Sequence, residues 1–340
     1  MKHLLGMTLQ ELKVVASQLS LPAYAAKQMA DWLYKKKITS VGEMTNISAA
    51  KRELLSSDYD ISAAPPVEAM RSADGTIKYL FAVGDGSRFV EAVYIPSKDR
   101  ATICVSSQVG CKMNCLFCMT GKQGFSAQLS SNEIINQIQS IPEHEELTNI
   151  VFMGMGEPLD NPKEVYKALE ILTSPYGYSW SPKRVTVSSI GILPELKHFL
   201  ENSSCHLAIS LHSPFHEERL SLMPVEKVYH IDNIINLLLE YDFSHQRRVS
   251  FEYIMFENLN DTSRHAKELS RLLKGLDCRV NLIKFHSLQG VNLQSSNERR
   301  IEAFRDELNS LGITCTIRAS RGEDIYAACG MLSTAKNNAK

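Results

Sequence analysis

The sequence predicts an α/β fold, in which a parallel sheet with helical crossovers follows a helical unit and a few antiparallel strands. Three observations predict it. Residues 1 to 64 carry apolar residues at helical spacing, residues 65 to 97 alternate with period two, and strand-like and helix-like stretches alternate about six times from Ala101 onward. Such alternation favours parallel strands joined by right-handed crossovers. Six units suit a partial β/α barrel better than a closed eightfold one.

The composition is that of an ordinary globular enzyme. The 340 residues allow one large domain with an appendage, or two domains. No apolar run reaches membrane length, and the first residues lack the apolar core of a signal peptide. We therefore expect a cytoplasmic protein without a membrane partner. Eight cysteines in such a chain favour cluster binding or catalysis over disulfide bonds.

The net charge of −1 does not indicate a nucleic-acid-binding protein, whose domains are usually basic. If RNA is the substrate, its contacts must come from local clusters of positive charge. Each cluster could equally be a solvated surface run. The candidates are Lys35-Lys36-Lys37, Lys51-Arg52, Arg247-Arg248, and Arg318 with Arg321.

Residues 1 to 64 predict a helical accessory domain. Thr8–Glu11 matches a capping box at the start of the first helix. Pro22 opens a second helix that ends near Lys37, and a third helix begins near Ser48. The polar, basic outer face of this unit could clamp a large partner such as RNA, or the unit could be a plain packing appendage.

Residues 65 to 97 predict a short antiparallel β extension. Asp74-Gly75 and Asp85-Gly86 stand between its strands, where hairpin turns are expected. A carboxylate among strand apolars usually faces solvent, so the residues alone give Glu91 no role. The predicted strands are Val67–Arg71, Ile77–Val83 and Arg88–Ile95.

Residues 98 to 318 predict the barrel, and residues 319 to 340 a C-terminal loop and tail. In barrels of this kind the chemistry takes place at the carboxyl ends of the strands. The predicted strands are Ala101–Ser106, Asn149–Gly154, Arg184–Ser189, His206–Leu211, Val249–Met255 and Arg279–Phe285, and a last helix leads to Thr314–Arg318. The predicted helices include Ser130–Ser140, Pro162–Thr173, Ile231–Glu240, Thr262–Leu273 and Glu298–Leu311.

A cysteine triplet follows the first barrel strand. Cys111, Cys115 and Cys118 form a C-x3-C-x2-C motif, with Phe117 just before the last cysteine. Each thiolate can bind one corner of a 4Fe–4S cluster, which normally takes four thiolates, so three leave one iron open to another ligand. A zinc site that adds Cys104 is the alternative. Structural zinc sites favour paired C-x2–4-C units or late histidines, and no second pair lies nearby.

The triplet resembles the motif of the radical S-adenosylmethionine (SAM) enzymes, in which SAM chelates the open iron. The resemblance implies a partial (β/α)6 radical SAM barrel that binds a 4Fe–4S cluster and SAM. Gly156 and Glu157, after the second strand, match the element that holds the SAM amino group. The chemistry agrees, since glycine permits close approach of the backbone and a carboxylate accepts hydrogen bonds from an ammonium group.

Two more strand ends carry candidate SAM contacts. Ser188, after the third strand, and Ser210-Leu211-His212, after the fourth, stand where the ribose and carboxylate of SAM would lie. A serine or histidine at a strand end is also commonly a helix cap or a satisfied core group. Both interpretations remain open for these residues.

The other cysteines divide into two groups. Cys329 lies in the polar loop Arg321–Gly330, and Cys104 stands seven residues before the triplet. These two thiols could meet if the C-terminal loop folds over the barrel mouth. The remaining cysteines sit in or beside apolar runs and are predicted to be small core residues. They are Cys205, Cys278 and Cys315.

Four stretches together resemble the RNA adenine-C2 methyltransferases of the RlmN type, and the resemblance covers nearly the whole chain. They are Ser106–Cys111, Gly154–Pro158, Ser210–His212 and Asp324–Gly330. The resemblance implies that Cys329 carries the methyl group, that Cys104 resolves the adduct, and that Glu91 is the proton acceptor. The cluster ligands it implies are Cys111, Cys115 and Cys118, and the SAM contacts are Gly156, Glu157, Ser188, Ser210, Leu211, His212 and His286.

Two residues depart from the family pattern. The family often has asparagine at the position of His286, which could still donate or accept one hydrogen bond to SAM. The family also often has aspartate at the position of Tyr326, just before Ala-Ala-Cys. Nothing in the sequence explains the second change.

The resemblance also implies partners and a reaction sequence. The RNA partners are 23S ribosomal RNA, at its peptidyl transferase centre, and transfer RNA. An external electron donor of the flavodoxin or ferredoxin type supplies electrons, and the enzyme is expected to be a monomer. Two SAM molecules serve each turnover, one to methylate Cys329 and one to generate a radical from that methyl group. A radical route suits adenine C2, because this carbon lies between two ring nitrogens and is a weak nucleophile. Cys104 then forms a disulfide with Cys329, and either Glu91 or Cys104 removes the C2 proton.

Three alternatives remain at this stage. Methyltransferases that modify C8 of the same ribosomal adenosine share the cysteines, but they typically have alanine where this chain has Pro158. A radical SAM activase or mutase acting on proteins or small molecules would not need Cys104 and Cys329. A zinc-containing RNA-binding protein would have no catalytic activity.

Overall fold

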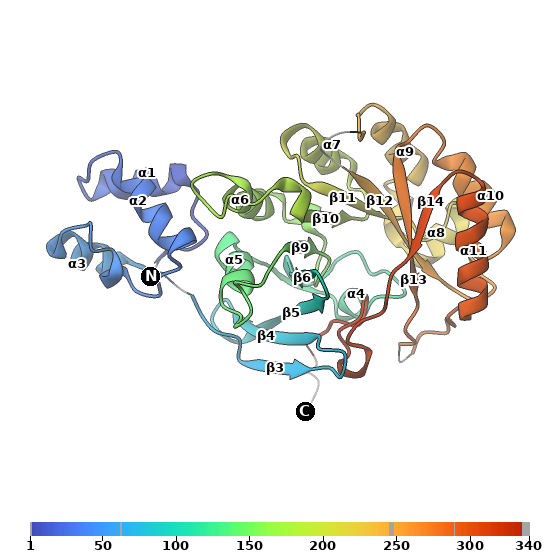
Figure 1. Ribbon diagram of the computed structural model, residues 1–340, viewed down its shortest axis with the longest axis horizontal. Helices are drawn as coiled ribbons and strands as arrows, with labels where there is room; N and C mark the ends of the chain where they lie inside the picture. Colours follow the sequence, from blue (N-terminus) through green and yellow to red (C-terminus); the bar gives the residue numbers. More distant parts are fainter. Residues whose placement is uncertain (1, 62, 245–247, 289, 335–340) are drawn as a thin grey trace.

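The computed structural model describes residues 2–61, 63–244, 248–288 and 290–334. Its centre is one sheet of ten strands, in the order β14-β13-β12-β11-β10-β9-β6-β5-β4-β3 (Figure 1). Strands β6 to β14 of this sheet are parallel, and β3, β4, β5 and β6 pair antiparallel. This arrangement confirms the predicted α/β fold. Arg247 lies outside the described residues.

The amino-terminal unit stands beside the sheet and packs on its first two crossover helices (Figure 1). Thr8 caps its first helix with the predicted capping box. A two-stranded parallel pair, absent from the prediction, joins the start of the unit to its end. The elements are β1 (Lys2–His3), α1 (Leu9–Gln18), α2 (Ala25–Ala30), η1 (Asp31–Lys35), η2 (Val41–Glu43), α3 (Ala49–Asp58) and β2 (Tyr59–Asp60).

The antiparallel extension continues the sheet without a break. The alternating residues Ile77, Tyr79, Phe81 and Val83 of its second strand are buried, whereas its first strand is mostly exposed, and the Asp-Gly pairs form turns as predicted. Its strands are β3 (Glu68–Arg71), β4 (Ile77–Val83) and β5 (Arg88–Ser97).

Seven parallel strands follow, and in the described chain six helical crossovers join them. Their buried residues are mostly Ile, Val, Leu and Phe. The strands are β6 (Arg100–Cys104), β9 (Asn149–Phe152), β10 (Val185–Ser189), β11 (His206–Ser210), β12 (Val249–Met255), β13 (Cys278–Lys284) and β14 (Thr314–Ile317).

Amphipathic helices cover the outside of the parallel strands (Figure 1). No helix of the described chain is long and apolar enough to cross a membrane. The helices are α5 (Ser131–Gln139), α6 (Pro162–Thr173), α7 (Leu193–Asn202), α8 (His216–Leu222), α9 (Ile231–Leu239), α10 (Ser263–Leu272) and α11 (Glu298–Ser310). The short helices are η3 (Pro158–Asp160), η4 (Pro182–Arg184), η5 (Pro224–Lys227) and η6 (Glu323–Ile325).

The cysteine triplet lies on a loop that a second small sheet holds in place. Strand β7 (Gln108–Gly110) pairs antiparallel with β8 (Phe125–Gln128), and α4 (Met119–Gln123) begins directly after Cys118. The sequence analysis does not predict this hairpin. It closes the loop at both ends, so the three cysteines are confined to one short connection.

Candidate active site

The three cysteines of the triplet place their thiols close together, and two of these thiols are strongly shielded from water. Burial raises the pKa of Cys111 to about 12 and that of Cys115 well above its usual value. The neighbouring thiols raise both values further, because like charges repel. Without a metal these thiols stay protonated, and three of them on one short loop can bind together as thiolates, so this donor set fits an iron–sulfur cluster.

Gly156 and Glu157 lie next to the cluster loop. Glu157 is buried, its carboxylate accepts the backbone N–H groups of Leu159 and Ile190 at 3.1 Å each, and burial raises its pKa to about 7. Its charge raises the pKa of Cys111 and Cys115, which shows how near the two elements are.

Gly156 has no room for a side chain. Its φ is 99°, and a Cβ atom there would stand 2.5 Å from the Cβ atom of Gln108. Glycine at this position therefore lets the turn pack directly against Gln108 of β7.

The remaining SAM candidates stand at adjacent strand ends. Ser188 is in β10 and Ser210 ends β11, and β10 lies between β11 and β9, the strand that leads to Gly156. His212 is buried, accepts the N–H of Ile254 on Nδ1 at 3.1 Å, and has its pKa lowered by burial to about 3. It is therefore neutral, and its ring contacts Phe117 edge-on at 4.6 Å.

Leu211 is fully buried, and its N–H donates to the carbonyl of Glu252 at 3.0 Å. His286 lies elsewhere on the site, where its Nε2 is 2.7 Å from the Ser320 hydroxyl and its Nδ1 is 3.7 Å from Glu323. Burial lowers the pKa of His286. The structure thus brings most of the SAM candidates together, while His286 contacts the C-terminal segment.

A cavity of about 620 Å³ runs along the inner face of the parallel strands. Cys104, Cys118 and Cys329 all line it. The side chain of Cys329 is accessible from the cavity, whereas Cys104 is buried in its wall. Burial raises the pKa of Cys104 to about 12, and a thiolate at Cys329 raises it further. Burial also raises the pKa of Cys329, and a thiolate at Cys118 adds to that rise. The two distant cysteines and the cluster loop are therefore neighbours.

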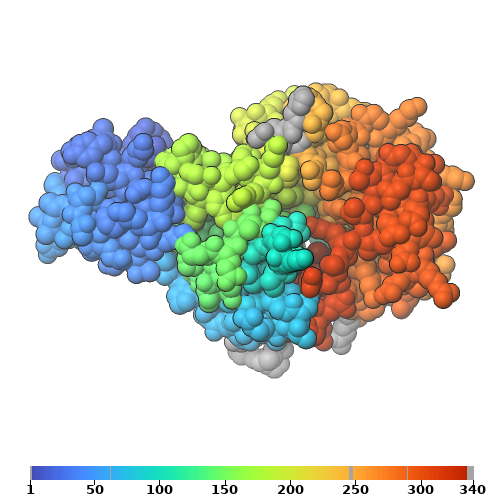
Figure 2. Space-filling model, in the orientation of Figure 1, coloured from blue at the N-terminus to red at the C-terminus, as the bar shows by residue number. Residues whose placement is uncertain are grey.

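The C-terminal segment, residues 319–334, brings Cys329 to this place. It lies between the antiparallel strands and the last parallel strands (Figure 2). Gly330 accepts the N–H of Met119 at 2.8 Å, and Leu332 accepts the Thr120 hydroxyl at 2.7 Å. These contacts attach the segment to α4, the helix that follows the cluster cysteines.

An ion pair that the sequence analysis misses stands beside Cys329. Glu252 in β12 is buried and points into the cavity, where its carboxylate lies 3.1 Å from Arg318 Nη1 and 2.8 Å from Asn281 Nδ2. The positive charge of Arg318 lowers the pKa of both Cys104 and Cys329 against the effect of burial. The cavity thus contains a group that favours thiolates.

The prediction that Glu91 faces solvent is wrong. Glu91 is 5% exposed, lies 3.0 Å from Lys78 Nζ and accepts the N–H of Ser333 at 2.9 Å. These two partners replace water and make the burial tolerable. Burial raises the pKa of Glu91, and Lys78 opposes the rise. The carboxylate anchors the C-terminal segment, and it is not among the residues that line the cavity.

Two of the three cysteines predicted to be core residues are buried. Cys205 and Cys315 are buried, while Cys278 is only partly buried. Tyr326 is 66% exposed with a φ of 54°, and its carbonyl lies 3.4 Å from Lys78 Nζ. Nothing in the structure explains why this position carries tyrosine.

Several of the predicted basic clusters are engaged within the protein. Lys37 pairs with Glu145, Lys51 donates to the carbonyl of Leu19, and Arg52 donates to the carbonyl of Ile47. A different cluster gathers at the amino ends of the parallel strands. It consists of Arg100, Lys183, Arg248 and Arg279, all of which line the cavity.

Sequence and structure comparisons agree on one family. The radical SAM superfamily profile matches residues 105–269, and the profile described as "Ribosomal RNA large subunit methyltransferase N-terminal domain" matches residues 2–61. A relative from Parabacteroides distasonis, named "Probable dual-specificity RNA methyltransferase RlmN", is 69% identical over 99% of this chain and 98% of its own length. A relative of the same name from Bacteroides fragilis is 62% identical over 98% of this chain and 96% of its own.

A solved structure leads to the same conclusion. The crystal structure of a radical SAM methyltransferase from Sphaerobacter thermophilus has a TM-score of 0.91 and 36% identity, covering 98% of this chain and 99% of that one. Radical SAM membership brings with it a 4Fe–4S cluster and SAM as cofactors, which the three cysteine thiols and the Gly156–Glu157 element suit. The chain belongs to the RlmN family of radical SAM RNA methyltransferases.

Proposed function

We infer that this protein methylates C2 of one adenosine in 23S ribosomal RNA and of one adenosine in transfer RNA, with Cys329 as the methyl carrier and Cys104 as the resolving thiol. The observation that carries this proposal is the position of Cys104 and Cys329 in one cavity, next to Cys118 of the cluster loop. A radical SAM enzyme without a methyl carrier has no need of two further thiols there.

In this proposal Cys111, Cys115 and Cys118 hold the cluster. Gly156, Glu157, Ser188 and the stretch Ser210-Leu211-His212 hold SAM. When bound, the cluster and SAM supply the methyl group and the radical chemistry that activates it. Every other step falls to side chains of this chain.

Cys329 acts first as a nucleophile. Thiolates are strong nucleophiles; burial raises the pKa of Cys329, and the positive charge of Arg318 opposes that rise. Because this thiol is accessible from the cavity, it can receive a methyl group and then bond through it to a bound adenine. The product of that stage is a thioether between Cys329 and the base.

Cys104 then releases the base. Its thiolate attacks the Cys329 sulfur, an S–S bond forms, and the C–S bond breaks with its electron pair left on the departing carbon. C2 first gives up its own proton to a base, and the single electron left over from the radical addition would return to the cluster. The departing carbon then becomes the methyl group on gaining a proton. Cys104 lines the cavity and Glu91 does not, so the cavity geometry favours Cys104 as that base.

The cluster of Arg100, Lys183, Arg248 and Arg279 supports an RNA substrate. Arg248 and Arg279 stand close enough for their charges to oppose each other, and Arg248 also lowers the pKa of His206, which burial brings to about 4. Such a concentration of positive charge attracts phosphates. We place the RNA backbone at this end of the cavity, with an unstacked adenine reaching toward Cys329.

The amino-terminal unit is a second candidate RNA surface. A groove there is lined by Lys27, Lys35, Lys36 and the rings of Tyr24 and Trp32. Lys36 Nζ stands 3.4 Å from the centroid of a Trp32 ring. Lysines interleaved with aromatic rings suit unpaired nucleotides, which bind by stacking and by phosphate contacts.

A flavodoxin or ferredoxin as electron donor, a monomeric state and a cytoplasmic location complete the proposal. The deciding experiment is nucleoside mass spectrometry of ribosomal and transfer RNA from cells lacking the gene, with and without the wild-type gene restored. We expect 2-methyladenosine in both RNAs only when the gene is present. Pro158 already favours C2 over C8, and 8-methyladenosine as the product would refute the proposal.

A further inference from the structure

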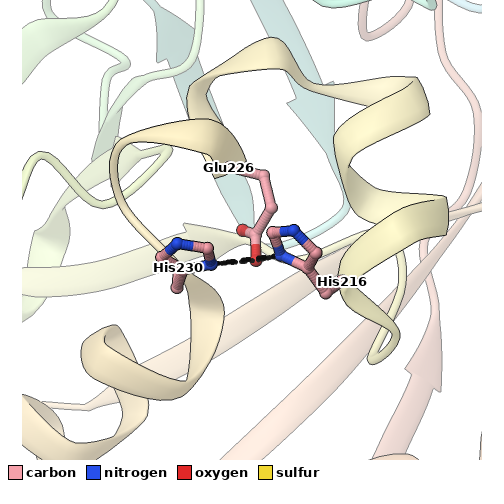
Figure 3. A group of neighbouring side chains, drawn as sticks. All are labelled: His216, Glu226 and His230. Carbon is pink, nitrogen blue, oxygen red and sulfur yellow. Dashed lines mark hydrogen bonds and ion pairs between the residues drawn. The ribbon is translucent and has the colours of Figure 1, made fainter.

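Two histidines and a glutamate meet outside the active site. His216 is the first residue of α8, His230 caps the start of α9, and Glu226 lies in η5 between them. Figure 3 shows the three side chains pointing toward one another. Their side chains are 38%, 47% and 1% exposed for His216, His230 and Glu226, so the group opens to solvent on the histidine side.

The three facing atoms have the spacing of metal ligands. His216 Nδ1 is 3.0 Å from Glu226 Oε1 and 3.1 Å from His230 Nδ1, and His230 Nδ1 is 3.7 Å from the same carboxylate oxygen. Tetrahedral zinc with bonds of about 2.0–2.2 Å places its ligand atoms about 3.3–3.6 Å apart. The observed triangle is close to one face of that tetrahedron.

Hydrogen bonds alone satisfy this triangle poorly. The other oxygen of Glu226 pairs with Arg219, and a carboxylate in such an ion pair only accepts hydrogen bonds. One proton on His216 Nδ1 would have to serve both the carboxylate and the second imidazole. A cation at the centre satisfies all three lone pairs at once. The ring planes differ by 30°, and both rings are more than one third exposed, so a rotation that aims both lone pairs inward meets little resistance.

The glutamate is held firmly in place from behind. Arg219 is fully buried and pairs with Glu226 Oε2, while the N–H of Ile231 donates to Glu226 Oε1 at 3.2 Å. Arg219 also donates to the carbonyls of Ser210 at 3.1 Å and Leu211 at 3.2 Å. A fixed carboxylate with two mobile imidazoles in front is a partly formed site that is linked to the SAM-binding strand end.

We propose that His216, Glu226 and His230 bind one divalent transition-metal ion, with water in the fourth position. Two imidazoles and one carboxylate suit Zn²⁺, whereas Mg²⁺ and Ca²⁺ prefer oxygen ligands alone. The ion joins α8 to α9 and, through Glu226 and Arg219, stabilises the backbone of Ser210 and Leu211. Its role is to position these residues, and it takes no part in the methylation chemistry.

The test counts metal in the intact protein. Anaerobically purified, cluster-loaded protein is dialysed against micromolar Zn²⁺, and iron and zinc per chain are measured by mass spectrometry. We compare the wild-type chain with the double variant His216→Asn/His230→Asn. His3→Asn is the matched control, because His3 is also an exposed histidine whose Nδ1 contacts a carboxylate, that of Asp60 at 2.7 Å.

The wild-type chain and His3→Asn should each take up one zinc ion that the double variant lacks, with equal iron in all three. Zinc should also raise the thermal unfolding midpoint of the wild-type chain and leave that of the double variant unchanged. Should the double variant fold poorly, His230→Asn alone serves, with zinc affinity at least tenfold weaker. Equal zinc content in the wild-type chain and the variant, or no zinc in either, overturns the proposal. Neither outcome depends on whether RNA is methylated.

Discussion

Arg318 Nη1 lies 3.1 Å from Glu252 Oε2, on the wall of the cavity into which Cys329 opens. The carboxylate fixes the guanidinium, and the guanidinium opposes the rise that burial causes in the pKa of Cys104 and Cys329. The pair thus links an inward-facing residue of a central strand to the reactivity of two cysteines.

The first prediction concerns this link. Arg318→Gln removes the positive charge, so the pKa of Cys329 rises and less thiolate is present at any pH below it. A rise of about one unit in the pKa of Cys329 slows alkylation of this thiol about tenfold at a fixed pH. The pH dependence of iodoacetamide labelling, followed by peptide mass spectrometry, measures the shift. Arg321→Gln, on the same cavity, should leave the profile in place. An unchanged profile in Arg318→Gln would contradict the link.

Cys329→Ala should abolish RNA methylation. Loss of a covalent nucleophile costs at least about three orders of magnitude in rate, and no other thiol is proposed to carry the methyl group. Methylated adenosine is counted after digestion of the RNA. Cys278→Ala, which alters a partly buried cysteine at the start of β13, is the control and should remain active. Normal product from Cys329→Ala would rule out the carrier role.

Cys104→Ala should trap the thioether between protein and RNA, because the attacking thiol that breaks the C–S bond is missing. The adduct appears as a slowly migrating, ribonuclease-sensitive band on denaturing gels. Cys315→Ala, a buried cysteine of β14, should give no such band. Free methylated RNA at normal yield from Cys104→Ala would refute the resolving role.

Arg248→Gln combined with Arg279→Gln should weaken RNA binding. Fewer phosphate contacts raise KM, on the order of tenfold, and make it less sensitive to salt, while kcat changes little. Steady-state kinetics at two salt concentrations tests both effects. The matched control is Arg305→Gln, on the exposed face of α11, where Arg305 pairs with Asp306. An equal rise of KM in the control would remove any special role for the cavity cluster.

Arg219→Leu should destabilise the protein by about 3–5 kcal/mol, because it leaves the buried carboxylate of Glu226 without its partner. Urea unfolding measures the loss. Arg271→Leu breaks a pair with Glu268 in which the arginine is 69% exposed, and no measurable change is expected. Similar stability of the two variants would show that Arg219 is not a structural anchor.

The main fold could be predicted because its signals are local. Ile77–Val83, Pro162–Thr173 and Val249–Met255 have the predicted bounds, since apolar period and turn residues define them within the segment itself. The hairpin of β7 and β8 could not be predicted, because Gln108–Gly110 carries a single apolar side chain. Its pairing depends on the loop that brings β8 back beside it.

Site residues that belong to a sequence motif could be predicted. Site residues whose burial depends on charged partners far away in the sequence could not. Cys111, Cys115 and Cys118 are recognisable from their spacing alone. Glu91 and Glu252 look like solvent-facing residues, because the partners that permit their burial are Lys78 on another strand and Arg318 near the end of the chain. The only sequence signal for Glu91 and Glu252 is that each is a carboxylate within an apolar strand.

The C-terminal segment leaves β14 at one edge of the ten-stranded sheet and attaches to the other edge. There the N–H of Gly322 donates to Asp74 at 2.9 Å, and Asp324 accepts the Ser72 hydroxyl at 2.5 Å, both beside the turn that follows β3. The same peptide that carries the reactive sulfur therefore ties the two margins of an incomplete barrel together. Truncating the chain after Ile317 would remove both the link between the two sheet edges and Cys329. A shortened chain would therefore lose the closure of the barrel and the proposed methyl carrier together.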